Sequence, residues 1–432
     1  MKNYFSTETP LSSSPPSRRD FLRSAAVGAA ALTLWPLGLR GRDSAADGKP
    51  DFATREVFDR IDLSINGGDG YKHDNPETSL LFWGQSYIME AYNVMYEAYR
   101  DSYYIEKVID HIDHVLAIRD SERGVTDYRG LSTPAWRISD RGLAPFIPFV
   151  GTAMLVYPMV HAARIIRETP ELNANPKYRA KVDQYIEAAE KAVAVHEFQW
   201  KILEDGNGWY VRPKGFPRDY DGIEKQFNMV LRMGMVHLQL AALTGKAEHL
   251  DRALQIGRRW KEDLWVDQND GLLWHYHWTG SRAFRGWTVQ DGVSENSPDF
   301  SGNQRMEDIS HGHVSLGFAE LAFRHGLLFD KEDMQRFANT FNRNATVQNA
   351  DGQPTMSWFI DGSGEAGGAR VEMSAGPWAR LAPFNQQVFH TVREIHNRFG
   401  FPRSRAHLML VGSAYLNRAA QNASPIPESA KL

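Results

Sequence analysis

The chain has 432 residues, of which 42% are hydrophobic, and a formal net charge of −4. It is long enough for one large domain or two ordinary ones, and it lacks the basic stripe that a nucleic-acid partner would require. The absence of cysteine excludes disulfides, thiolate metal sites, a thiol nucleophile and a lipidated cysteine.

The N-terminal segment has the pattern of an export signal. Ser17–Arg23 (SRRDFLR) is a twin-arginine signature, followed by the apolar stretch Ala25–Leu37 and by the small residues Ser44–Ala46. The apolar stretch is too short to cross a bilayer, and no second apolar run approaches the ~20 residues that a membrane span needs. We therefore expect residues 1–46 to be a signal peptide and the mature protein to be periplasmic or secreted, with no membrane span.

Residues 47–79 are polar and rich in glycine, so we expect them to lead into the folded domain. From residue 80 to residue 422 the apolar spacing predicts nearly continuous helices in one domain. The tail 423–432 has no such pattern, and we expect it to be disordered.

A helical hairpin followed by an aromatic segment is clearest over Phe227–Trp278. Phe227–Leu243 is almost wholly apolar, as expected of a buried helix, and Ala247–Trp265 has one apolar face. Gly245 separates the two helices, and glycine suits a left-handed helix end. The turn Asn269–Gly271 then leads to the aromatic segment Leu272–Trp278.

The same module recurs along the chain. Tyr87–Tyr99 pairs with Tyr103–Ile118, Val314–Phe329 pairs with Glu332–Asn344, and Arg179–Phe198 is a further outer helix. Repeated helical hairpins indicate a stacked or closed array. We therefore predict an all-α (α/α) toroid of six or seven hairpins, with long loops at one mouth.

Two long interruptions, 279–305 and 360–382, lie beside aromatic segments, and long loops inside a compact domain are often functional. We interpret both as lids or cleft walls. Aromatic rings after the turns can stack on sugars, although core packing is the alternative for about half of them. The candidate sugar-binding aromatics are Tyr128, Trp136, Trp209, Tyr210, Trp274, Trp278 and Trp358, together with Tyr276.

The densest polar cluster is Glu307–His313 (EDISHGH), at the start of an apolar helix. Asp308 or Ser310 can cap that helix, and capping alone is the simpler explanation of the cluster. A histidine in the first turn would face the mouth of a toroid, where the positive helix end favours the neutral ring that a general base needs. His311 is the candidate base, with Glu307, Asp308 and His313 as candidate substrate contacts.

His275 and His277 form a second His-x-His pair beside His311 and His313. Two such pairs could bind a metal ion, or the histidines could simply accompany sugar-binding aromatics. Because no run of acidic ligands accompanies them, we predict neither a metal nor a cofactor, and we retain His275 and His277 as substrate contacts.

Asn228 opens an inner helix, so it could approach His311 at the mouth, or it could merely cap its own helix. An amide beside a neutral histidine suits proton abstraction next to a carboxylate, because the amide stabilises the enolate-like intermediate. Arg212, Arg305 and Arg370 lie in or beside the loops and could pair with an acidic sugar, or remain solvated surface charges.

The chain resembles bacterial (α/α)-toroid polysaccharide lyases that cut alginate or glucuronan. The resemblance runs from about residue 80 to about residue 400. The residues that carry it are Gly208-Trp209-Tyr210, Phe227-Asn228, Thr244-Gly245, Leu250–Ala253, Glu307–Gly312, Phe329 and Asn339–Phe341.

Such lyases are similar to metal-independent β-eliminating enzymes that use Asn, His, Arg and Tyr. The resemblance implies that Asn228 binds the carboxylate, His311 is the base and Arg370 assists. The family tyrosine would lie shortly after Arg370, yet Val371–Leu381 contains no tyrosine. Tyr276, or Tyr128, would have to protonate the leaving oxygen from another loop.

The leading prediction is an exported lyase that cleaves an acidic polysaccharide by β-elimination. The second is a toroidal glycoside hydrolase with Glu307 or Asp308 as acid and Asp361 or Asp127 as base. The third is a non-catalytic carbohydrate-binding protein of the periplasm. None of the three predicts a nucleic-acid partner, and the sequence does not fix the oligomeric state.

Overall fold

The computed structural model describes residues 50–139, 144–218, 220–402 and 404–421. The predicted signal peptide and the predicted C-terminal tail lie outside these residues. Lys49–Leu432 forms one compact unit, and it is mostly helical, with three two-stranded antiparallel sheets among the described residues.

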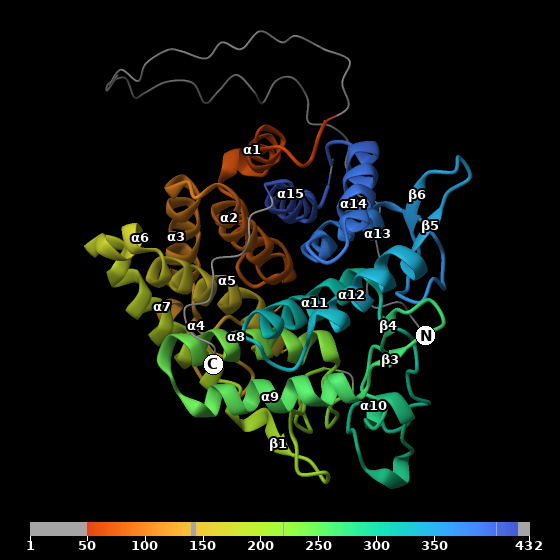
Figure 1. The fold of residues 1–432 in the computed structure, drawn as a ribbon. Coiled ribbons are helices and arrows are strands. Elements are labelled where there is room, and N and C mark those ends of the chain that lie inside the picture. Colours follow the sequence, from red (N-terminus) through yellow and green to blue (C-terminus); the bar gives the residue numbers. More distant parts are fainter. Residues whose placement is uncertain (1–49, 140–143, 219, 403, 422–432) are drawn as a thin grey trace, which may run out of the picture. The chain divides into compact units, whose positions relative to one another are not determined.

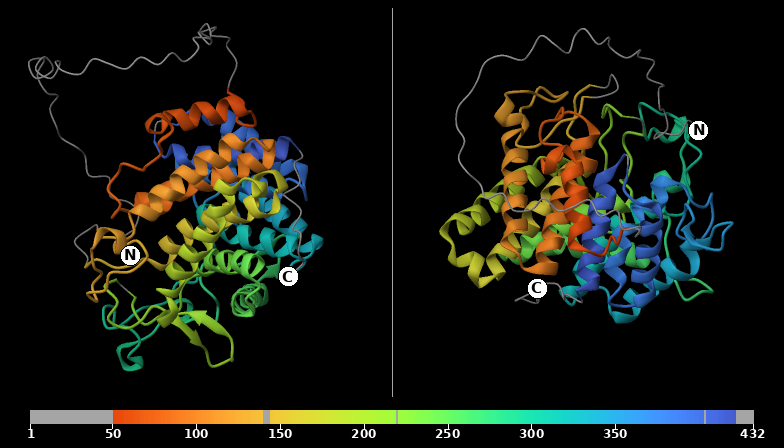
Figure 2. Two further views of the ribbon diagram at one scale, coloured as in Figure 1. Left: turned by 90° about the vertical axis from the view of Figure 1, so that its left-hand side faces the viewer. Right: turned by 90° about the horizontal axis from the view of Figure 1, so that it is seen from above.

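An inner ring of helices forms the core of this unit (Figure 1). Each inner element packs against the next, and α15 returns to pack against α2, which closes the ring. The inner elements are α2 (Ser86–Tyr99), α5 (Phe149–Glu168), α8 (Phe227–Thr244), α11 (Ile309–Arg324), the short 3₁₀ helix η7 (Gly376–Leu381) and α15 (Ala406–Ala420). Figures 1 and 2 show the colours passing round this ring in sequence order, from orange α2 to blue α15.

Each inner element has an outer partner that contacts it on the far side from the ring centre. The outer helices are α1 (Arg55–Ser64), α3 (Ser102–Ala117), α7 (Pro176–Ala194), α9 (Ala247–Glu262), α12 (Lys331–Asn339) and α14 (Gln386–Phe399). Among the described residues the ring therefore has six hairpins, and the predicted (α/α) toroid is confirmed.

The predicted module is a helical hairpin followed by a short β-hairpin. Gly245 ends α8 in the left-handed region (φ 68°), where the absence of a Cβ avoids a clash. After α9 the chain forms β3 and β4 around the turn Asn269–Gly271. Equivalent hairpins follow α7 and α12. The strands are β1 (Trp200–Ile202), β2 (Gly208–Tyr210), β3 (Trp265–Val266), β4 (Leu272–Leu273), β5 (Thr346–Gln348) and β6 (Pro354–Met356).

Side-chain caps set where several outer helices begin. Asp101, Asn175 and Asn385 each accept a hydrogen bond from a backbone N–H of the first turn of α3, α7 and α14. Asp330 and Asp333 form a reciprocal capping box at the start of α12. These local signals fix where the outer helices begin; of the three helices capped by one side chain, α3 and α7 were predicted from apolar spacing and α14 was not.

Two segments were predicted as irregular but belong to the ring. Residues 47–79 contain α1, which packs on α15 as its outer partner, because Phe58 and Ile61 are fully buried. The predicted lid 360–382 contains α13 (Ala369–Ser374) and η7, and η7 completes the inner ring with Trp378 buried. Glycine and proline in this segment hid a short helix that only the surrounding ring stabilises.

Short helical turns connect the longer elements. They are η2 (Asn66–Gly68), η3 (Leu81–Gln85), α4 (Asp120–Arg123), α6 (Pro170–Ala174), η4 (Glu197–Gln199), α10 (Arg282–Arg285), η5 (Val289–Asp291) and η6 (Thr340–Ala345). The loop 279–305, predicted as a lid or cleft wall, holds α10 and η5 and packs on residues 220–223 through its own small apolar cluster.

Helix α5 is 20 residues long and apolar enough to cross a membrane by length and composition, so the expectation that no second apolar run approaches this length is wrong. However, 94% of its most apolar window is buried inside the protein. Its position in the inner ring accounts for its composition, since such a helix is covered by neighbours on most sides.

Ion pairs fill the centre of the ring. Glu90 on α2 contacts Arg232 of α8 (2.7 Å) and Arg380 of η7 (3.4 Å), and it accepts a hydrogen bond from the Tyr415 hydroxyl (2.7 Å). The carboxylates of Glu97 and Glu320 are held in the same way by arginines of α11 and α15. Charges buried at this depth are tolerated only when they are paired and hydrogen-bonded.

The paired glutamates predict loss of stability in acid. Burial raises the pKa of Glu90, but the charges of Arg232 and Arg380 outweigh this effect and lower the pKa from 4.5 to about 2. The pKa values of Glu97 and Glu320 are lowered as well. Because the folded pKa lies below the unfolded one, this stability is complete above pH 4.5 and is lost as the pH falls towards 2. We expect the thermal unfolding midpoint to fall between pH 5 and pH 3; a flat profile there would contradict the assignment.

Candidate functional site

The segment before α11 is held between two extended neighbours. On one side, Glu307 N donates to Trp274 O (3.2 Å) and Tyr276 N donates to Arg305 O (3.0 Å). On the other side, Ile309 N donates to Trp358 O (3.1 Å) and Ile360 N donates to Glu307 O (3.1 Å). Both neighbouring segments follow β-hairpins, so the repeated module itself fixes the first turn of α11.

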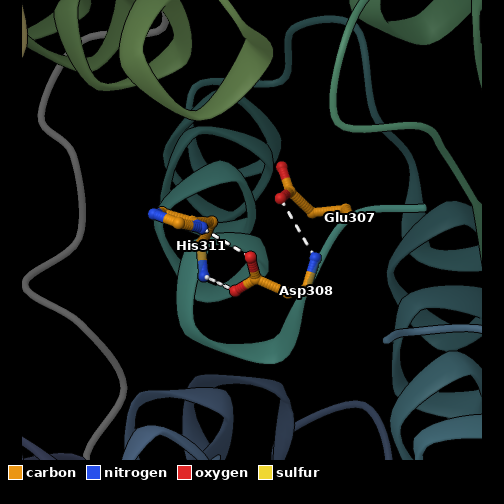
Figure 3. A group of neighbouring side chains, drawn as sticks. All are labelled: Glu307, Asp308 and His311. Carbon is orange, nitrogen blue, oxygen red and sulfur yellow. Dashed lines mark hydrogen bonds and ion pairs between the residues drawn. The ribbon is translucent and has the colours of Figure 1, made fainter. Parts of the chain in front are cut away.

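Asp308 and His311 form a dyad at the start of α11 (Figure 3). Asp308 is the N-cap, as predicted, and its Oδ1 accepts from His311 N (3.0 Å) while its Oδ2 lies 2.7 Å from His311 Nδ1. Burial raises the pKa of Asp308, but interaction with His311 and hydrogen bonds from His311 and Ser310 bring it well below its ordinary value. An ionised Asp308 can only accept, so Nδ1 of His311 carries a proton and Nε2 is the nitrogen left to exchange one with a substrate.

Aromatic rings flank the His311 imidazole. The Tyr276 ring centroid lies 5.5 Å from that of His311, and the Trp83 ring centroid lies 6.4 Å from it. The Tyr276 hydroxyl accepts a hydrogen bond from the side-chain amide of Gln226, the N-cap of α8 (2.9 Å). Burial raises the pKa of Tyr276 to about 12, so this hydroxyl keeps its proton at neutral pH.

Arginines from two loops lie against the dyad. The Arg305 guanidinium lies 3.9 Å above the centre of the Tyr276 ring and 4.0 Å from the Asp308 carboxylate. Arg370 donates to Ser310 Oγ (3.2 Å) and lies over the Trp358 ring at 5.4 Å. Tyr276, Arg305, Arg370 and Trp358, all predicted as site residues, are therefore gathered around the start of α11.

The side chain of Glu307 points away from solvent. It is fully buried, its Oε1 accepts from Asp308 N (3.1 Å), and its Oε2 has no hydrogen-bond partner among the described residues. Burial and the neighbouring Asp308 charge raise the pKa of Glu307 well above 4.5, which favours the protonated carboxyl. The Glu307 carboxyl is therefore closed off from solvent.

The buried acid gives a sharp prediction for Glu307→Gln. An amide is isosteric with a protonated carboxyl, so we expect the variant to keep its activity. Its unfolding midpoint at pH 7 should match or exceed that of the wild type, because a raised folded pKa costs stability as the pH rises above 4.5. The checks are initial rates and thermal unfolding, and loss of activity with an unchanged fold would make Glu307 the catalytic acid.

Four predicted sugar-binding aromatics are corrected, because their rings fill the space between hairpins. Each is at most 1% exposed and packs in the core: Trp136, Trp209, Tyr210 and Trp274. The indole N–H groups of Trp136 and Trp209 donate to backbone carbonyls (2.7 and 2.9 Å). Tyr128 and Trp278 are partly buried and contact Phe216 and Arg259 respectively.

The histidine pairs do not form a four-histidine metal site. His275 packs between the rings of Trp265 and Phe284, and His313 reaches the Tyr87 hydroxyl (3.3 Å) instead. Burial lowers the pKa of both His277 and His313 to about 3, so both are neutral. Among the residues that the structure describes, the one group with ligand atoms close enough to suggest a metal is Glu307, Asp308 and His311.

Two further predicted residues lie on the α8 side of the site. Asn228 is in the first turn of α8 but does not cap it, since the N-cap is Gln226 and neither Asn228 amide atom has a partner among the described residues. Arg212 is partly buried in a loop, where it donates to Tyr220 O (3.2 Å), and desolvation lowers its pKa to about 10.

The carboxylates assigned to the hydrolase alternative are all engaged elsewhere. Both oxygens of Asp308 hold His311, and Asp127 is buried in an ion pair with Arg129 (2.7 Å). Asp361 accepts from the backbone N–H and the hydroxyl of Ser363. Glu307, Asp308 and Asp127 are buried, whereas Asp361 is partly exposed.

Sequence reasoning missed Trp83, Gln226 and its neighbour Lys225, and it named Ser310 only as a possible cap. Lys225 and Gln226 directly precede the apolar helix α8, and polar residues at such a boundary are the signal that could have identified them. Trp83 precedes α2 in a segment without any motif, so its place beside His311 follows from ring closure alone.

Sequence comparison identifies only the export signal. A model of the TAT (twin-arginine translocation) pathway signal sequence matches residues 15–35. No curated protein sequence matches the chain.

Solved structures similar to this one share its fold at low sequence identity. They include a family 76 glycoside hydrolase from a bovine Bacteroides thetaiotaomicron strain (11% identity, TM-score 0.50, covering 86% of this chain and 79% of that chain). A D-mannose isomerase has 10% identity and a TM-score of 0.50, with 85% and 98% covered. The α-1,6-mannanase GH76A from Salegentibacter sp. HEL1_6 has 12% identity and a TM-score of 0.48, with 85% and 98% covered. The chain thus has the (α/α)-toroid fold and is exported by the twin-arginine route to the periplasm or beyond.

Proposed function

We propose that the protein is an exported enzyme that processes a polysaccharide or oligosaccharide, with His311 as its proton-transfer group. The observation that carries this proposal is the Asp308–His311 hydrogen bond (2.7 Å) at the start of an inner helix, with Tyr276 and Trp83 flanking the imidazole. Asp308 orients the ring and stabilises its protonated form. The aromatic faces offer contact surface for a sugar ring.

Glycoside hydrolysis is the reaction that the fold comparison supports better than β-elimination. The family 76 glycoside hydrolase shares the toroid at a TM-score of 0.50, and the sugar isomerase of equal score places a second kind of saccharide chemistry on the same fold. Because the carboxylates of Glu307 and Asp308 are buried and engaged, hydrolysis here would use His311, rather than a carboxylate pair, to activate water.

β-Elimination from an acidic polysaccharide such as alginate or glucuronan is the second candidate, and the side chains around His311 favour it. Arg305 and Arg370 lie beside the dyad, and the orphaned amide of Asn228 opens the neighbouring helix. In this reaction Asn228 and an arginine would bind the uronate carboxylate, His311 would remove the C5 proton, and Tyr276 would protonate the leaving oxygen.

The test is the product formed from defined oligosaccharides. Incubation with α-1,6-mannan, alginate and glucuronan is followed by reducing-sugar release and by ultraviolet absorbance of a new C4–C5 double bond. Reducing sugar without absorbance identifies hydrolysis, and absorbance identifies β-elimination. If the protein binds saccharides but forms no product from a broad panel of them, and does not interconvert aldoses and ketoses either, the enzyme proposal is overturned and a binding protein remains.

A further inference from the structure

The start of helix α8 carries polar groups that the protein leaves without partners. Asn228 is 1% exposed, and both its Nδ2 and Oδ1 lack hydrogen-bond partners among the described residues. The N-cap Gln226 does not cap the helix with its side chain, which donates to Tyr276 instead. A buried amide without partners is costly, so such a group in the first turn of a helix marks a place where a ligand can supply them.

Lys225, immediately before the cap, is a buried lysine that lies against aromatic rings. It is 5% exposed, and its Nζ lies over the rings of Phe149 (5.1 Å) and Phe216 (5.9 Å). No carboxylate of the described residues forms an ion pair with it. Burial, and then the Arg212 charge, lower the pKa of Lys225 well below 10.5, and its own charge lowers the pKa of His196 in turn.

We propose that Lys225, Asn228 and the first turn of α8 form a subsite for an anionic group, a carboxylate or a sulfate, carried by the saccharide. The positive end of this 18-residue helix and its first N–H groups favour an anion, the ammonium supplies the opposite charge, and the amide donates a hydrogen bond. Lys225 is thus a specificity-determining residue. The inference deepens the proposed function, on which it rests for the identity of the ligand as a saccharide.

The subsite adjoins the dyad through a chain of contacts. Gln226, between Lys225 and Asn228, donates to the Tyr276 hydroxyl, and the Tyr276 ring lies 5.5 Å from that of His311. A saccharide whose anionic group lies at α8 can therefore present a neighbouring carbon or oxygen to His311. A neutral sugar would leave the ammonium and the amide without partners, and that penalty provides the selectivity.

Calorimetry on the full-length mature protein tests the subsite. The probes are an oligoglucuronate, a sulfated oligosaccharide of the same length and a neutral α-1,6-mannooligosaccharide, each titrated into His311→Ala, which should not consume them. We expect one anionic probe to bind at least about tenfold more tightly than the neutral one. Lys225→Met in the same background should abolish that difference, and the carboxylate and sulfate arms identify the group.

Proton uptake gives a second signature. An anion that pairs with Lys225 raises its pKa, so the binding heat should vary with the ionisation enthalpy of the buffer, and this variation should vanish in Lys225→Met. Lys201→Met, at an exposed lysine of β1, is the matched control and should change neither signal. Asn228→Asp, which places a carboxylate at the subsite, should weaken anion binding even if Lys225→Met folds poorly.

Equal binding of neutral and anionic probes, no binding of either anionic probe, or an unchanged preference in both variants would overturn the subsite. These outcomes are independent of the dyad. If His311→Ala remains active while Lys225→Met loses the preference for anions, the subsite stands and the proposed proton-transfer role fails.

Discussion

Replacing His311 with alanine should lower kcat by ~10²–10⁴-fold, the usual contribution of a positioned acid–base group. Loss of the imidazole removes the only atom of the dyad that can exchange a proton with a substrate, since both oxygens of Asp308 are held by the first turn of α11. The measurement is the initial rate on the polysaccharide that gives product in the assay with α-1,6-mannan, alginate and glucuronan. The fold should persist, because alanine is a good helix former.

Asp308→Asn should reduce kcat as well, with little change in KM. Asparagine still caps α11, but its amide no longer selects the tautomer with Nε2 as the base. His390→Ala, at an exposed position of α14, serves as the histidine control and should behave like the wild type. If both dyad variants keep full activity and an intact fold, the catalytic residues do not lie at the start of α11.

Removing Glu90 should destabilise the protein by about 3–5 kcal/mol, the usual cost of breaking a buried ion pair from one side. In Glu90→Ala the guanidinium groups of Arg232 and Arg380 and the Tyr415 hydroxyl lose their shared acceptor at the centre of the ring. Urea unfolding followed by circular dichroism measures the loss. The effect should be large because these groups have no access to water that could replace the carboxylate.

Glu187→Ala on the exposed face of α7 is the matched control. Its ion pair with Lys191 (2.6 Å) is solvated and screened, so its removal should leave the unfolding midpoint unchanged. The double variant Glu90→Ala with Arg232→Met should recover part of the lost stability, because it removes one of the uncompensated charges. Equal effects of Glu90→Ala and Glu187→Ala would show that the central network contributes no more than a surface pair.

Local signals in the sequence located several helical hairpins and the start of α11. The alternation of an apolar helix, a glycine such as Gly245 and an amphipathic helix follows from backbone geometry and burial, which act within a few residues. The same locality explains why Asp308 could be recognised as a cap and His311 as the residue beside it. The twin-arginine signal is also local, and its match to residues 15–35 confirms it.

Patterns within one segment of the sequence could not predict how the ring of helices closes. Helix α1 lies far from α15 in the chain, yet the two pack together, and η7 is a helix in a segment rich in glycine and proline. Their apolar residues become buried only after the other hairpins are in place. The segments predicted as a lead-in and as a lid were therefore misjudged, although their sequences are unambiguous once the ring is known.

The sequence by itself determined the hairpin repeat and the export signal, and it offered Asp308 as a possible cap and His311 as a candidate base, because each depends on residues that are neighbours in the chain. Only the tertiary structure decided which aromatic rings face the core, that Tyr276 lies beside His311, and that Lys225 forms no ion pair with a carboxylate of the described residues. Burial and charge pairing are set by residues dozens to hundreds of positions apart, and no pattern within one segment records which partners will surround it.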